Sequence, residues 1–148
     1  HHCKVIDNGI IGERRHWVTV GTFKVLPFLC HHDVHNLGFY IHSTVTGENL
    51  LYFTDTYYIE PVFPNLNYIM AECNYDPQAI ASGRIPLALK KRLMKSHMSI
   101  DTFIEMLKKN DLSQVRQIYL LHLSDNNSRA DEFKRRVQAE SGCEVYIA

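Results

Sequence analysis

The hydrophobic pattern changes near the middle of the chain, and this change limits the folds that the sequence can adopt. Up to residue 54, short apolar segments with a period of two are separated by turn residues, which is typical of antiparallel strands. After residue 66, strand-like segments alternate with segments of helical period, as in strand–helix–strand units around a buried sheet. The sequence therefore predicts an α/β fold with an antiparallel meander, followed by strand, helix, strand, helix and strand.

The boundaries of these elements follow from turn residues and helix caps. Strands are expected over residues 16–20, 22–29, 37–43, 50–54, 67–73, 118–121 and 143–147, and residues 4–6 could add a short one. Helices are expected from Pro86 to about Lys95, after an N-cap at Ser99, and from a capping box of Ser128 and Asp131 to Gly142. The segment 118–121 is apolar throughout, which predicts a strand covered on both faces.

Size and composition predict one domain over residues 1–148, with a hydrophobic core of its own. Lys plus Arg and Asp plus Glu number 16 each, so no net charge attracts a polyanion, although a local groove can still be basic. The four cysteines form no C-x-x-C pair, which argues against a zinc ribbon and favours free buried thiols. With no signal peptide and no apolar run near the roughly 20 residues of a membrane span, we expect a cytoplasmic protein without membrane contact.

Three candidate metal ligands lie where predicted strands end. His32 follows the strand that ends near Leu29, Asp55 follows the strand 50–54, and His122 follows the strand 118–121. Strand ends of one sheet can share an edge, and His and Asp are ligands of zinc, manganese and iron in hydrolytic sites. Each residue alone also fits a structural role, as a hydrogen-bonded His or a turn-forming Asp.

Neighbouring residues leave further alternatives open. His31 and His35 are either solvated loop residues or substitute ligands. Glu72 is either a partner that orients a ligand His or a satisfied carboxylate at a buried strand end. The Tyr57–Tyr58 pair either stacks on bases or packs in a loop.

The order of these motifs resembles the C-terminal half of the metallo-β-lactamase fold over about residues 16–148. The segments that carry the resemblance are Gly21–Val25 leading to His32-Asp33, Leu37-Gly38-Phe39, Leu51–Thr56, Ala71–Asp76, His97-Met98-Ser99 and Leu120–Ser124. They are most similar to the exonuclease-like branch of small cytoplasmic members, including relatives of ribonuclease Z. The resemblance implies an αββα sandwich, of which this chain forms mainly the C-terminal part.

The resemblance also implies roles for single residues. His32, Asp55 and His122 match metal ligands of the family, with Asp55 as the bridging carboxylate. Asp55 and His97 match its catalytic residues, and His97 resembles a histidine near the scissile phosphate of nuclease members. The implied cofactor is a divalent metal, Zn²⁺ in the first place, with Mn²⁺ or Fe²⁺ as alternatives. The implied activity is hydrolysis of phosphodiester bonds in nucleic acid by a metal-activated water.

The sequence departs from the family at its main signature. The family motif His-x-His-x-Asp-His is absent, and the segment 31–35 has the right residue types at a different spacing. A second hypothesis follows: a truncated fragment without activity, in which metal is partly or wholly absent. It would serve as a structural or binding half that needs a homo-oligomer or a partner. A third is a nucleotide-binding domain with one metal ion or none.

Overall fold

A mixed sheet of seven strands is the central element of the computed structural model, which describes residues 10–11, 14–83, 86–125 and 128–148. The strands are β1 (Ile10–Ile11), β2 (Arg14–Arg15), β3 (Val18–Val20), β4 (Phe23–Leu29), β5 (Leu37–Ser43), β6 (Asn49–Phe53), β7 (Tyr68–Glu72), β8 (Gln117–Leu121) and β9 (Glu144–Ile147). The helices are α1 (Pro77–Ser82), α2 (Leu87–Ser96), α3 (Ile100–Lys109) and α4 (Ala130–Ser141). β1 and β2 pair only with each other, and β3 to β9 follow one another across the large sheet in sequence order.

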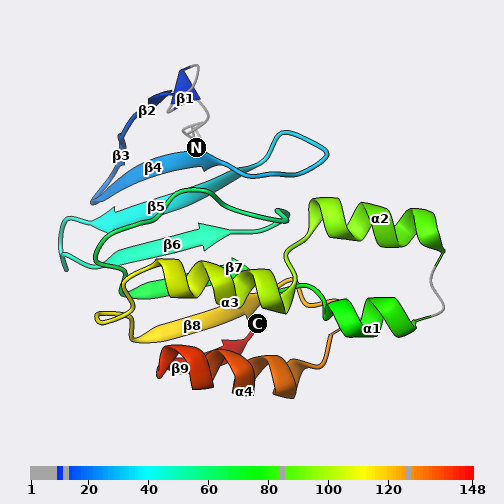
Figure 1. Cartoon of the computed structure of the whole chain (residues 1–148). Helices are drawn as coiled ribbons and strands as arrows, with labels where there is room; N and C mark the ends of the chain where they lie inside the picture. The colour runs from blue at the N-terminus through cyan, green and yellow to red at the C-terminus, as the bar shows by residue number, and fades with distance from the viewer. Residues whose placement is uncertain (1–9, 12–13, 84–85, 126–127) are drawn as a thin grey trace.

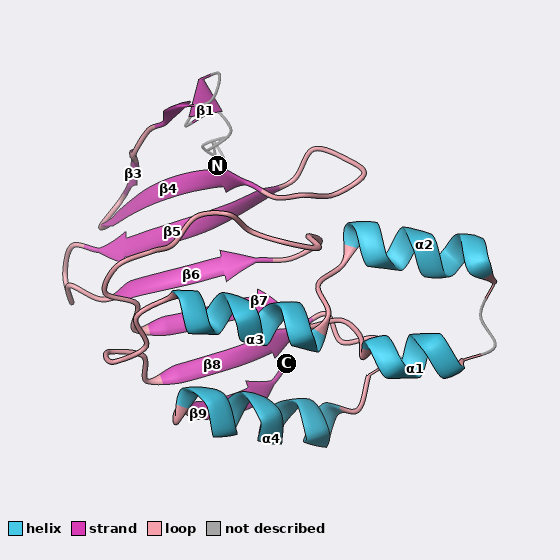
Figure 2. Ribbon diagram, in the orientation of Figure 1, coloured by secondary structure: helices cyan, strands magenta, loops and turns pink. Residues whose placement is uncertain are grey.

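Strand direction changes where the sequence pattern changes. Pairs from β3 to β6 are antiparallel, whereas β6, β7, β8 and β9 run parallel to one another. Helices α3 and α4 lie on one face of the sheet, and α1 and α2 lie beyond the ends of the parallel strands (Figures 1 and 2). The predicted α/β class and the order of strands and helices are confirmed.

Element bounds agree with the structure to within one or two residues, but two local predictions are wrong. The segment 118–121 is not covered on both faces, because Ile118 and Leu120 are buried whereas Tyr119 and Leu121 on the other face are half-exposed. Ser99 caps α3 by accepting a hydrogen bond from the backbone N–H of Thr102, and Gly142 ends α4 at a φ of 68°. The predicted capping box is wrong, because the Ser128 hydroxyl donates to the Ser124 carbonyl at 2.7 Å and Arg129 occupies the N-cap. The predicted strand over residues 4–6 lies outside the described residues.

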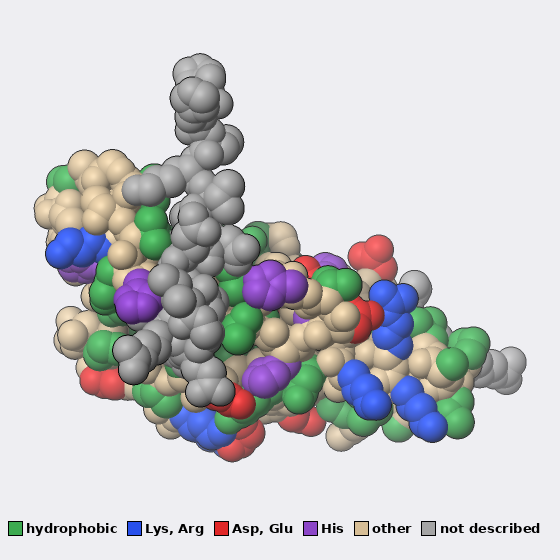
Figure 3. All heavy atoms as spheres, turned by 90° about the horizontal axis from the view of Figure 1, so that it is seen from above, with side chains coloured by type: hydrophobic (Ala, Val, Ile, Leu, Met, Phe, Trp, Pro, Cys, Tyr) green, Lys and Arg blue, Asp and Glu red, His purple; other side chains and the backbone are tan. Residues whose placement is uncertain are grey.

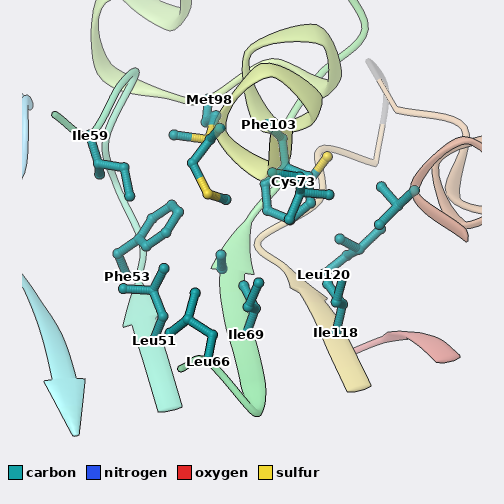
Figure 4. Close-up of a cluster of buried hydrophobic side chains, with 14 of the residues drawn as sticks. Leu51, Phe53, Ile59, Leu66, Ile69, Cys73, Met98, Phe103, Ile118 and Leu120 are labelled. Atoms are coloured by element: carbon teal, nitrogen blue, oxygen red, sulfur yellow. The ribbon is translucent and has the colours of Figure 1, made fainter. Parts of the chain in front are cut away.

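The hydrophobic core lies between the sheet and its helices. Leu51 and Phe53 of β6 contribute to it together with Ile118 and Leu120 of β8, and Phe103 of α3 packs over them (Figure 4). Burying each of these large apolar side chains stabilises the folded state by roughly 1.5–3 kcal/mol. These contacts hold β6, β7 and β8 side by side, so that their carboxyl ends share one edge of the sheet.

The opposite face of the sheet is also apolar. A row of paired residues crosses it from strand to strand: Phe39, Tyr52, Met70, Tyr119 and Tyr146. The rings of Phe39 and Tyr52 lie 6.4 Å apart, and those of Tyr119 and Tyr146 lie 5.2 Å apart. Within the described ranges no helix lies on this face (Figure 1), and no member of the row belongs to the buried core.

The described cysteines are free thiols, as expected. Cys30 and Cys73 are buried and Cys143 is half-buried, whereas Cys3 lies outside the described residues. Burial of the thiol raises the pKa of Cys30 to about 12, with the carboxylates of Glu72 and Asp55 acting in the same direction and a hydrogen bond with Thr56 opposing them. Among the described helices, none has the length and apolar character to cross a membrane.

Gly38 faces the ring of Phe28 so closely that even one methyl group does not fit. A Cβ at Gly38 would overlap three ring carbons of Phe28, the farthest of them at 2.8 Å, and Phe28 is fully buried. We expect Gly38→Ala to lower the free energy of unfolding by about 1–3 kcal/mol through overpacking. Urea unfolding measures this loss. The double variant Gly38→Ala, Phe28→Leu should lose less free energy of unfolding than the sum of the losses in the two single variants. If the two losses simply add, the two residues are not in contact as described.

The buried thiol of Cys30 predicts a loss of stability in alkaline solution. The unfolded thiol gives up its proton near pH 8.5, whereas the folded one keeps it to about pH 12, so the folded state binds more protons in between. The free energy of unfolding therefore falls as the pH rises above about 8.5, by up to about 1.4 kcal/mol per pH unit. Urea unfolding at several pH values above about 8.5 should show a smaller fall in the free energy of unfolding for Cys30→Ala than for the wild type. The same dependence on pH in both proteins would contradict the prediction.

Candidate metal centre

Four side chains that can ligate a metal meet at the carboxyl edge of the parallel strands. Asp55 lies two residues after β6, Glu72 is the last residue of β7, His122 follows β8, and His97 caps the end of α2. One ligand atom from each of the four lies within 4.8 Å of all the others. Segments far apart in the sequence thus contribute to a single polar cluster.

The distances inside the cluster fit a small cation. His122 Nδ1 lies 3.3 Å from Asp55 Oδ1 and 3.3 Å from Glu72 Oε1, and His97 Nδ1 lies 3.7 Å from Asp55 Oδ1. Four ligands about 2.1 Å from a tetrahedral zinc ion are separated by about 3.4 Å from one another. Only the contact between His97 Nδ1 and Glu72 Oε1, at 2.5 Å, is a direct hydrogen bond that would have to lengthen. Two imidazoles and two carboxylates also form a donor set that zinc, manganese and iron accept.

Glu72 is the buried member of the cluster. Its side chain is fully buried, whereas those of Asp55 and His122 are 39% and 45% exposed. Its Oε2 accepts the backbone N–H of Thr56 at 2.9 Å, and its Oε1 faces the two histidines. The hydrogen bond with Glu72 raises the pKa of His97, against the opposing effect of burial. A cation bound here would therefore compete with a proton on His97.

Two residues of the cluster have a backbone conformation that L-residues rarely adopt. Asp55 has a φ of 51° and His122 a φ of 55°, both in the left-handed region. An asparagine amide holds each of them: Asn36 Nδ2 donates to the Asp55 carbonyl at 3.0 Å, and Asn74 Nδ2 donates to the His122 carbonyl at 2.7 Å. A strained backbone conformation of this kind costs of order 1–3 kcal/mol per residue. It persists only because the surrounding contacts, such as these two hydrogen bonds, hold the backbone in place.

The structure brings together three of the four site residues expected from the sequence. Asp55, His97 and His122 meet in the cluster, and their role as ligands or catalysts stays a prediction. His32 lies beside them: its ring centre is 5.6 Å from that of His97, and its Nδ1 lies 2.8 Å from Asp33 Oδ1. His31 faces away, with Nε2 at 3.4 Å from Glu60 Oε1.

Glu72 is the member that sequence reasoning placed only in a supporting role. Its position between Ala71 and Cys73, at the end of an apolar strand, is the signal that could have singled it out, because a charged residue there needs partners. Asn36 and Asn74 gave no signal in the sequence. Asn74 Oδ1 is a buried oxygen without a hydrogen-bond partner among the described residues.

A wide hollow of about 840 Å³ lies at the other ends of the strands. Trp17, Tyr40, Lys24 and Asn49 are among its lining residues, and Asn49 begins the strand that ends near Asp55. The hollow and the four-residue cluster are therefore separate features of the fold. The chemistry of metal ligation belongs to the cluster, because the hollow has no comparable set of carboxylates and imidazoles among its lining residues.

The bond from Asn74 to the His122 carbonyl predicts a positioning role. In Asn74→Ala the strained turn at His122 is released, so we expect affinity for Zn²⁺ to fall by about 10–100-fold, as for other residues that orient ligands. Isothermal titration calorimetry measures the affinity. Asn67→Ala is a matched control, since Asn67 also bonds backbone groups but lies at the far ends of the strands. Equal loss in both variants would contradict the role.

Comparison with known proteins rests on structure. No protein-family model matches the chain, and no curated protein matches it. The metallo-β-lactamase fold protein YhfI from Bacillus subtilis matches with a TM-score of 0.65 and 18% identity, over 89% of this chain and 49% of that protein. Yeast PDE1 matches with a TM-score of 0.61 and 14% identity, over 94% and 47% of the two chains. Human tRNase Z, short form, matches with a TM-score of 0.55 and 14% identity, over 97% and 51%.

These likenesses concern the fold alone. The chain spans about half the length of the structures that it matches. Its sheet and the two helices on one face correspond to one sheet and one helix layer of an αββα sandwich. The chain therefore has the metallo-β-lactamase fold over about half the length of these proteins.

Proposed function

We propose that this protein is a metal-dependent hydrolase that cleaves phosphodiester bonds in nucleic acid. The observation that carries the proposal is the cluster of Asp55, Glu72, His97 and His122 at the carboxyl edge of the parallel strands. A divalent ion bound there, Zn²⁺ first and Mn²⁺ or Fe²⁺ as alternatives, would polarise a phosphoryl oxygen and lower the pKa of a water. Fold likeness to a tRNase Z supports nucleic acid as the substrate class.

The solvent exposure of each residue in the cluster indicates its role. Glu72 would hold the ion from the protein side, because its side chain is fully buried. Asp55 and His122 lie at the surface, where a substrate phosphate can reach them. His97 is oriented by its bond to Glu72 and can hold or release a proton beside the substrate. His32, next to His97, remains the proposed additional ligand.

Aromatic rings beside the cluster support a nucleic-acid substrate. Tyr57 follows Asp55 by two residues and is exposed, and its ring centre lies 5.5 Å from that of His31. Base–aromatic stacking contributes about 1–3 kcal/mol per base and tolerates any sequence. A base of a bound strand can therefore stack on the exposed ring of Tyr57.

Metal binding and hydrolysis test the proposal together. We expect calorimetry to give a bound Zn²⁺ ion and the loaded protein to hydrolyse bis(p-nitrophenyl) phosphate and a short oligonucleotide. Asp55→Asn and His122→Ala should each lower kcat/KM by about 10²–10³-fold, the size of one lost electrostatic contact to a transition state. His42→Ala is the control, because His42 bonds Asn49 at the far ends of the strands. Hydrolysis that both cluster variants retain would overturn the proposal.

The apolar row on the open sheet face favours a second candidate function. Here the chain serves as a binding half without activity, and a second copy or a partner covers Phe39, Tyr52, Met70, Tyr119 and Tyr146. Analytical ultracentrifugation separates the candidates. A dimer that Tyr52→Glu dissociates, in a protein that binds no Zn²⁺, supports the binding half. A monomer with bound Zn²⁺ and hydrolytic activity excludes it.

A further inference from the structure

Helix α2 has an unusual charge for a chain whose acidic and basic residues balance. Its ten residues include Lys90, Lys91, Arg92 and Lys95 and no acidic residue. Lys91, Arg92 and Lys95 are exposed, and Lys and Arg side chains gather at the end of the molecule that α2 forms (Figure 3). Helix α2 thus carries a local excess of positive charge, while the net charge of the chain is zero.

The spacing of these residues places like charges side by side. Lys95 lies three residues after Arg92 and four after Lys91, so the three side chains share one helix face. Like charges at these spacings destabilise a helix by roughly 0.2–0.5 kcal/mol per pair, and α2 has no acidic residue to offset them. Helix α3 shows the usual arrangement, since Lys108 Nζ bonds Glu105 Oε1 at 3.0 Å.

Contacts connect the basic helix directly to the candidate metal centre. His97, the residue that ends α2, is a member of the cluster. Arg92 Nε lies 3.4 Å from Asp33 Oδ2, and the other oxygen of Asp33 lies 2.8 Å from His32 Nδ1. The ring of His32 in turn adjoins that of His97. The basic face therefore begins where a substrate phosphate would meet the cluster.

We infer that the basic face of α2, formed by Lys91, Arg92 and Lys95, is the docking surface for the phosphate backbone of a nucleic-acid strand. The inference rests on the proposed function and specifies how its substrate is held. Lys91 and Lys95 are four residues apart, about 6 Å along the helix axis, and a strand in a duplex presents one phosphate per about 3.4 Å of axis. The face therefore spans about two neighbouring phosphates, and α2 itself carries no acidic residue that would repel them.

Salt-dependent binding tests this surface apart from catalysis. Fluorescence anisotropy of a labelled oligodeoxynucleotide, single-stranded or duplex, is measured in EDTA, so that neither metal binding nor hydrolysis enters. We compare the wild type with the triple variant Lys91→Gln, Arg92→Gln, Lys95→Gln between about 50 and 200 mM salt. We expect the slope of log K against log salt to shrink by roughly 0.7 per lost contact on a single strand and 0.9 on a duplex.

The matched control removes the same charge elsewhere. Lys108→Gln, Lys134→Gln, Arg135→Gln alters three basic residues on α3 and α4 and should leave the slope near that of the wild type. Equal loss in both triple variants, or no binding of either oligonucleotide by the wild type, overturns the inference. If the α2 triple variant fails to fold by circular dichroism, Lys91→Gln alone should still reduce the slope by roughly 0.7–0.9, and an unchanged slope overturns it.

A membrane surface is the alternative partner, and a vesicle-binding experiment distinguishes it from nucleic acid. Exposed Leu87, Leu89 and Met94 on α2 accompany the basic residues, as in helices that lie on anionic lipid. Sedimentation with vesicles of phosphatidylglycerol and phosphatidylcholine provides the comparison. Vesicle binding that depends on Lys91, Arg92 and Lys95, without binding of the oligonucleotides, would replace the inference.

The two proposals can fail separately. Oligonucleotide binding through α2 in a protein that neither binds Zn²⁺ nor hydrolyses phosphodiesters would reject the proposed function and retain the docking surface. Hydrolysis that depends on Asp55, with the same salt slope in the wild type and the α2 triple variant, would do the reverse.

Discussion

A fully buried carboxylate at the end of β7 determines how the edge of the sheet is arranged. Removing the charge of Glu72 from water costs several kcal/mol unless hydrogen-bond donors or cations replace the water. Those partners come from three other segments: the Thr56 amide after β6, His97 at the end of α2, and His122 after β8. One buried charge therefore accounts for the meeting of residues that are remote in the sequence, and the parallel order of β6, β7 and β8 makes the meeting geometrically possible.

The position between Glu72 and the His97 ring can hold either a proton or a metal ion. In the arrangement described here, Glu72 bonds His97 directly and raises the pKa of its ring. A divalent ion would take the place of that shared proton, and the other distances in the cluster already fit its coordination sphere. Metal binding and protonation are thus linked, and affinity should rise with pH until His97 is neutral.

Sequence reasoning could predict the elements and the edge that they share, but not all of its residues. The sequence predicts that Asp55 and His122 share this edge, because strand ends are readable from hydrophobic patterns. Asn36 and Asn74 were not, because each amide bonds a carbonyl 19 or 48 residues away, and such distances leave no local signal. His32 has the right residue type and lies beside the cluster, where it contacts Asp33. The error at Ser128 has a different origin, because its hydroxyl donates to the Ser124 carbonyl four residues earlier and does not cap α4.

X-ray absorption spectroscopy of the Zn²⁺-loaded protein tests the central claim most directly. Coordination by Glu72, Asp55, His97 and His122 predicts nitrogen and oxygen ligands at about 2.0–2.2 Å, with imidazole scattering that weakens in His122→Ala. A sulfur ligand at about 2.3 Å, from a cysteine such as buried Cys30, or a spectrum that His122→Ala leaves unchanged, would contradict it.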